Sequence, residues 1–73
     1  MNNIIIIDKG QGAILINPAN IILNTDGIDF YPAQGDCLHV KWLNDESKAE
    51  LEYSRLCEEL KAGKTCIEFE SDF

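Results

Sequence analysis

Three short runs of apolar, mostly β-branched residues constrain the fold of this chain more than any other feature of its sequence. They are Ile4 to Ile7, Ala13 to Ile16 and Ile21 to Leu23. Residues of this kind favour strands. A sheet with one face in water alternates apolar and polar side chains, whereas these runs are apolar on both faces. We therefore expect a sheet whose second face is buried by curling into a small barrel, by dimerisation or by a binding partner.

Turn signals divide residues 3 to 43 into short strands. Lys9 to Gly12 predicts a hairpin connection, Asn17 to Asn20 a turn, and Asp26-Gly27 a tight turn. A second hairpin is predicted from Ile28 to Tyr31 and Cys37 to Leu43. In its second arm one face is apolar and the other is mixed, because Leu38, Val40 and Trp42 alternate with Cys37, His39 and Lys41.

The apolar period changes after Asn44 and predicts a helix from Ser47 to Ala62. Ser47 and Glu50 have the spacing of a capping box, with Asn44 and Asp45 as competing N-caps. Gly63 is suited to end the helix. The buried stripe is expected to consist of Ala49, Tyr53, Leu56, Cys57 and Leu60. A last strand is predicted from Thr65 to Phe69, with Phe73 packed at its end.

These elements predict one α+β domain over residues 1–73. We expect a small antiparallel, strongly twisted sheet or partly closed barrel of five to six short strands, with the helix packed across it and a final strand. A chain of 73 residues buries only about 60% of its unfolded surface, so the monomer is marginal and gains stability from a partner. No apolar run is long enough for a membrane span or a signal-peptide core, which favours a cytoplasmic protein.

Negative charge is concentrated in the C-terminal part of the chain. The formal net charge is −7, and residues 45–73 contain nine acidic against four basic side chains. We expect a partner-binding surface here, on the helix face away from the core and on the last strand, with Leu51 as an apolar anchor. Its expected residues are Leu51, Glu52, Arg55, Glu58, Glu59, Glu68 and Glu70. The alternative is a solvated face that only keeps the protein soluble.

The favoured function is a small acidic protein-binding module or inhibitor that docks on a basic surface of a larger protein. Small acidic phage inhibitors that occupy nucleic-acid-binding grooves are similar in size and charge, which suggests a phage-type anti-defence protein. Direct nucleic-acid binding is disfavoured because the six basic residues are dispersed. The alternative is a self-associating structural or assembly subunit, such as a homodimer, that uses the apolar second face of the sheet.

The three cysteines and the single histidine are the residues in this sequence that would form a zinc site. The odd number of cysteines favours reduced thiols over disulfides. A zinc site would combine Cys37, Cys57 and Cys66 with His39. The sequence lacks a C-x-x-C knuckle, so we expect neither a metal nor another cofactor.

Nucleophilic catalysis would need a cysteine paired with His39 and an orienting group. Cys37 is expected on the same strand face as His39, with Asp29 or Tyr31 across the hairpin. A domain of 8.2 kDa with one histidine has little room for a lined pocket. The sequence therefore predicts no enzyme and no catalytic residue.

Overall fold

The computed structural model describes residues 3–45 and 47–72, so Phe73, which we expected to pack at the strand end, lies outside the described residues. The elements in chain order are β1 (Ile5–Asp8), β2 (Ala13–Ile16), β3 (Pro18–Leu23), β4 (Gly27–Pro32), β5 (Leu38–Lys41), α1 (Lys48–Lys61) and β6 (Cys66–Phe69). The expected α+β class, with short strands, a helix in the C-terminal half and a final strand, is confirmed. The strands form two three-stranded sheets that do not close into a barrel.

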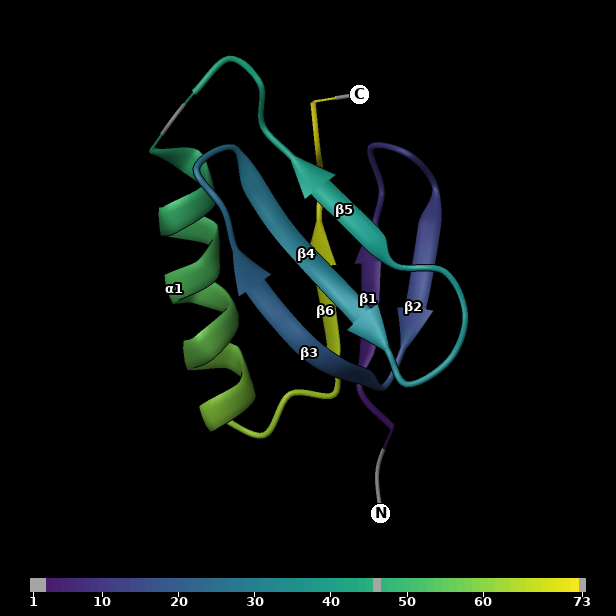
Figure 1. Ribbon diagram of the computed structural model, residues 1–73. Coiled ribbons are helices and arrows are strands. Elements are labelled where there is room, and N and C mark those ends of the chain that lie inside the picture. Colours follow the sequence, from purple (N-terminus) through teal and green to yellow (C-terminus); the bar gives the residue numbers. More distant parts are fainter. Residues whose placement is uncertain (1–2, 46, 73) are drawn as a thin grey trace.

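The first sheet has the strand order β2-β1-β6. Its β1–β2 hairpin is antiparallel, as expected, and pairs Ile6 with Leu15. The β6 strand instead runs parallel to β1, with Ile67 beside Ile6. A parallel pair needs a long connection, and here the chain between β1 and β6 includes the second sheet and α1. After α1 the chain enters β6 at the end of the sheet where β1 also begins, so the two strands run in the same direction (Figure 1). The expectation of a wholly antiparallel sheet is therefore wrong at β6.

A single residue, Asn17, separates β2 of the first sheet from β3 of the second. The predicted turn from Asn17 to Asn20 is shorter than expected, because β3 already begins at Pro18. Asn17 has a φ of +55°, a left-handed conformation that asparagine tolerates. Its side-chain oxygen accepts a hydrogen bond from the Ile4 N–H at 2.9 Å, and its own N–H donates to the Ile4 carbonyl at 2.7 Å. These bonds hold the chain where it leaves the first sheet for the second.

The second sheet has the order β3-β4-β5 and is antiparallel throughout. Its inner face packs on the inner face of the first sheet, and α1 packs along one side of the two sheets, against β3, β4 and β6 (Figure 1). The buried core contains Ile6, Leu15, Ile28, Phe30, Leu38, Val40, Trp42, Ala49, Leu56, Ile67 and Phe69. The alternation predicted for β5 and the helix stripe predicted around Leu56 are confirmed.

The helix lies where the sequence predicts it, but its start is built differently. Ser47 is the N-cap residue and makes no side-chain capping bond, so the predicted capping box is absent. The Asp45 carboxylate instead accepts bonds from the Ser47 N–H at 3.1 Å and the Ser47 hydroxyl at 2.8 Å. Gly63 follows the helix with a φ of +84°, which glycine adopts without strain. Within the described residues, no helix is both long and apolar enough to cross a membrane.

The predicted second apolar face is found on the outside of the first sheet. The inner faces of the two sheets bury each other, whereas the outer face of β1 and β2 faces away from the core. On this face Ile14 is 64% exposed and Ile16 is 54% exposed, while Ile5 and Ile7 are half-buried. We call these four isoleucines the isoleucine face.

Candidate functional site

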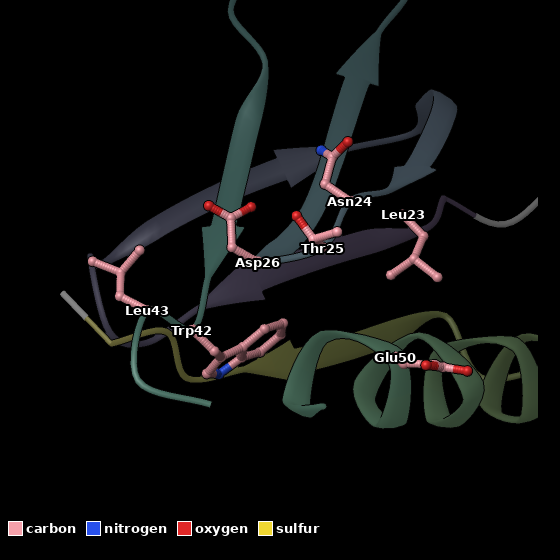
Figure 2. Close-up of a pocket in the computed structure, with 7 residues that line it drawn as sticks. All are labelled: Leu23, Asn24, Thr25, Asp26, Trp42, Leu43 and Glu50. Carbon is pink, nitrogen blue, oxygen red and sulfur yellow. The ribbon is translucent and has the colours of Figure 1, made fainter. Parts of the chain in front are cut away.

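A groove opens where the β3–β4 turn faces the first turns of α1 (Figure 2). It has a volume of about 760 Å³ and is lined by Leu23, Asn24, Thr25, Asp26, Trp42, Leu43 and Glu50. Leu43 is 66% exposed and Leu23 is 39% exposed, whereas Trp42 is buried. We call this the helix-start groove. It combines apolar walls with carboxylates in one concave surface.

Three hydrogen bonds hold the lining of the groove in place. The turn after β3 is closed by a bond from the Asn24 N–H to the Gly27 carbonyl at 2.8 Å, and the Trp42 N–H donates to the Asp26 carbonyl at 2.8 Å. The Trp42 indole N–H donates to the Glu70 carbonyl at 2.9 Å. These bonds fix the tryptophan ring between the β3–β4 turn and the start of α1 (Figure 2).

The groove carries negative charge that the protein does not neutralise internally. Within residues 3–45 and 47–72, neither Asp26 nor Glu50 forms an ion pair. Glu50 is exposed and Asp26 is half-buried. A cationic side chain seated between the two leucines would therefore meet carboxylates free to pair with it.

The structure divides the surface predicted from sequence into two parts. Leu51, which is 64% exposed, and Glu58 point away from the core on α1. The other members line a second groove between α1 and β6. They are Glu52, Arg55, Glu59, Glu68 and Glu70. Five of the seven predicted residues thus line one groove, and Leu51 and Glu58 lie outside its lining.

Arg55 neutralises much of this second groove. Its guanidinium pairs with Glu52 at 3.0 Å and with Glu59, donates to the Glu68 carbonyl at 2.7 Å, and stacks 4.9 Å from the centre of the Phe69 ring. The hydrogen bond from Arg55 holds the pKa of Glu59 below its usual range, and the bond to Glu52 raises the pKa of Arg55. Glu52 and Glu59 are therefore already paired and have little charge left for a partner.

Two further cations border the same groove. Lys9 lies 3.5 Å from Glu68, and Lys64 lies 3.5 Å from Glu59. The groove thus contains three cations and four carboxylates. Its charge is nearly balanced, in contrast to the helix-start groove.

The structure also brings together the nucleophile, base and orienting group considered from sequence. Cys37 Sγ lies 3.0 Å from His39 Nε2, and His39 Nδ1 lies 2.6 Å from Asp29 Oδ1. Tyr31 packs edge-on against the His39 ring, with 6.3 Å between ring centroids. Both candidates across the hairpin, Asp29 and Tyr31, are therefore neighbours of His39. We call Cys37, His39 and Asp29 the Cys-His-Asp cluster.

The other cysteines do not join this cluster. Cys66 lies on the outer face of the first sheet, opposite Ile5, and Cys57 lies on α1. No group of three or more histidine, cysteine or acidic side chains in the described part of the chain is arranged to hold a metal ion.

No known protein family, curated protein or solved structure matches this chain. The candidate sites therefore rest on their own geometry.

Sequence reasoning missed the helix-start groove although one signal for it was present. Leu43 directly follows Trp42, and two consecutive apolar residues cannot both face the core of an alternating strand. Since Trp42 is buried, Leu43 must point outward. Its neighbours Leu23 and Asp26 could not be assigned to the same site, because only the tertiary packing brings the β3–β4 turn to the helix.

Proposed function

We propose that this protein is a protein-binding module rather than an enzyme, and that its binding surface is the helix-start groove. The partner is a larger protein that presents a cationic side chain next to an apolar one on a basic surface. A nucleic-acid-binding groove is one surface of this kind, so the proposal includes an inhibitor of the type formed by small acidic phage proteins.

The observation that carries the proposal is the pairing of exposed leucines with unpaired carboxylates. Leu23 and Leu43 flank the buried Trp42, and Asp26 and Glu50 lie at the same groove. An apolar anchor in a groove supplies affinity, while complementary charge supplies orientation and a faster association rate. The net charge of −7 extends this attraction beyond the contact itself.

The proposal moves the binding surface relative to the one expected from sequence. Glu52 and Glu59 are paired with Arg55, so a basic partner would have to break those pairs before it could use them. Glu50 lies on the other flank of α1 and is free of such pairs in the described structure. The proposed binding surface is still acidic, but it lies at the helix-start groove instead of the α1–β6 groove.

A titration of ¹⁵N-labelled protein with a short peptide of alternating lysine and leucine tests the groove directly. We expect amide shifts to centre on residues 23–26, 42–43 and 50, and binding to weaken as salt is added. The double variant Asp26→Asn, Glu50→Gln should lose most of the binding. Glu58→Gln is the matched control, because Glu58 is an exposed carboxylate on the same helix outside the groove. Shifts centred on Glu52, Arg55 and Glu59 would return the site to the surface expected from sequence.

The second candidate function is self-assembly, which the isoleucine face favours. We propose a second copy of this chain as its occupant. The β2 strand forms a free edge of the sheet in the described structure, and Lys9 pairs with Glu68 at the border of the face. Two copies could therefore meet here without bringing unpaired carboxylates together, despite the overall net charge.

The oligomeric state separates the two candidates. Sedimentation velocity over a concentration series should detect a dimer, and Ile14→Lys should return it to a monomer. Ile22→Lys is the matched control, since Ile22 is 47% exposed on the outside of the other sheet. A wild-type protein that stays monomeric at high micromolar concentration would rule out assembly through this face.

A further inference from the structure

We propose that Cys37 is a reactive thiol, activated by His39 and Asp29, that forms mixed disulfides by exchange with low-molecular-weight disulfides. The proposal concerns the Cys-His-Asp cluster on the outer face of the β3-β4-β5 sheet. This cluster is separate from the helix-start groove and from the isoleucine face.

The backbone sets the geometry of the Cys-His-Asp cluster. Asp29 on β4 is directly opposite His39 on β5 in the antiparallel register, so their side chains leave the sheet side by side. Cys37 precedes β5 and is two residues from His39, which places its side chain on the same face. The Cys37–His39 and His39–Asp29 contacts of 3.0 Å and 2.6 Å follow from this register.

Asp29 is held to orient the histidine. Its side chain is 13% exposed, and its second oxygen accepts a bond from the Asn24 side-chain amide at 2.5 Å. The first oxygen accepts from His39 Nδ1–H, which leaves the Nε2 lone pair facing the thiol. A nucleophile within hydrogen-bond distance of a base, with the base oriented by a third group, is the arrangement that activates cysteine.

The exchange step needs only the groups present and an external disulfide. The Cys37 proton moves to His39 Nε2, and the thiolate attacks one sulfur of the disulfide. A new S–S bond forms, the old one breaks, and the departing thiolate takes the proton from the imidazolium. Cys37 is oxidised to the mixed disulfide while half of the external disulfide is reduced to a thiol.

Two observations favour this class of electrophile. Cys37 is exposed and lines neither of the two grooves, so the reaction suits a small reagent that meets the thiol from solution. Attack of a thiolate on a disulfide also creates no oxyanion. Acyl transfer does create one, and its rate depends on hydrogen-bond donors placed to stabilise that oxyanion. In the described structure the polar contact of Cys37 Sγ is with His39.

Cys66 provides an internal control, because it is also an exposed free cysteine and forms no side-chain hydrogen bond in the described structure. Peptide mass spectrometry measures the rates at which neutral iodoacetamide alkylates both thiols at pH 7, and cystamine then measures disulfide exchange. An ordinary thiol is a few per cent ionised at this pH. Because a base lies 3.0 Å from Cys37 Sγ and no such base contacts Cys66 in the described structure, we expect Cys37 to react severalfold faster than Cys66.

The variants test the cause of this difference. His39→Gln and Asp29→Asn should bring the Cys37 rate down towards the Cys66 rate. In concentrated guanidinium chloride the wild-type thiols should react at equal rates. The wild-type comparison requires no variant to fold, and equal rates in the native protein would overturn the proposal. A difference that persists in folded His39→Gln would overturn it as well.

Discussion

The buried carboxylate of Asp8 accepts a hydrogen bond from the backbone N–H of Ser71 at 3.0 Å, across 63 positions of sequence. The same carboxylate accepts bonds from the Gly10 N–H at 2.9 Å and the Gln11 side-chain amide at 2.6 Å. Asp8 is fully buried, and a buried charge is tolerated only when its oxygens are well satisfied. One side chain thus links the β1–β2 turn to the segment that follows β6.

Replacing Asp8 should destabilise the fold. In Asp8→Asn an amide N–H₂ replaces one acceptor oxygen and faces a donor, so at least one buried hydrogen bond is lost. We expect the free energy of unfolding to fall by about 2 kcal/mol, measured by urea denaturation. Asp36→Asn, in the exposed loop before β5, is the control and should change little. Equal unfolding free energies for wild type and Asp8→Asn would show that the buried carboxylate contributes nothing.

The same site predicts how stability depends on pH. Burial by itself would raise the pKa of Asp8, but the hydrogen bonds from Ser71, Gln11 and Gly10 outweigh it and hold the pKa below the usual range. The contribution of a carboxyl whose folded pKa is depressed is present above its unfolded pKa of about 3.9 and is lost as pH falls through the folded pKa. Urea denaturation at several pH values should therefore show the difference between wild type and Asp8→Asn shrink below about pH 4. A constant difference from pH 7 to pH 3 would contradict this.

Gly27 should not tolerate a side chain. A Cβ at this position would lie 2.2 Å from the Val40 carbonyl oxygen, in the paired backbone of β4 and β5. The neighbouring strand β5 cannot move away without breaking its backbone hydrogen bonds to β4. We therefore expect Gly27→Ala to lower the free energy of unfolding by about 3 kcal/mol, measured by thermal or urea denaturation. Gly12→Ala is the comparison, since its Cβ would meet nothing within 4 Å and only its φ of +66° is unfavourable; its cost should be about 1 kcal/mol. A smaller effect at Gly27 than at Gly12 would mean that the strands can separate.

Removing Arg55 should change carboxylate titration more than stability. Its side chain is 37% exposed, so solvent screens its ion pairs and Arg55→Met should cost no more than about 1 kcal/mol. The pKa of Glu59 should rise towards its usual range when the Arg55 hydrogen bond is lost. A ¹³C NMR titration of the glutamate side chains measures this, with Lys61→Met as the control on the same helix. If the pKa of Glu59 is the same in Arg55→Met as in the wild type, Arg55 does not bond to Glu59 in solution.

Much of the local structure was predictable because it depends on neighbouring residues. The β1–β2 hairpin, the face of β5 that carries Leu38 and the helix ending before Gly63 all follow from side-chain period and turn residues. The predicted capping box is absent because the Asp45 carboxylate accepts from the Ser47 N–H and the Ser47 hydroxyl, and sequence spacing does not decide which acceptor is closer.

A candidate site was predictable from the sequence only where all of its residues lie on one hairpin. The sequence indicated that Cys37, His39 and Asp29 could share a face, because a single β4–β5 register places them there. The ion pairs of Arg55 with Glu52 and Glu59 are local to the helix, since these residues are three and four positions apart. The sequence did not indicate that Arg55 would also contact the Phe69 ring and the Glu68 carbonyl. These two contacts depend on where α1 lies against β6.

The sequence by itself determined the elements of this protein and the excess of negative charge in its C-terminal part. It also determined that the sheet has more apolar surface than its own core can bury, because consecutive isoleucines must point to both faces of a strand. Only the tertiary structure decided that the sheet divides in two at Asn17, that β6 joins β1 in parallel, and that Ile14 and Ile16 are among the apolar residues left exposed. These outcomes depend on contacts between segments far apart in the chain, and the period of a sequence records only the contacts of near neighbours.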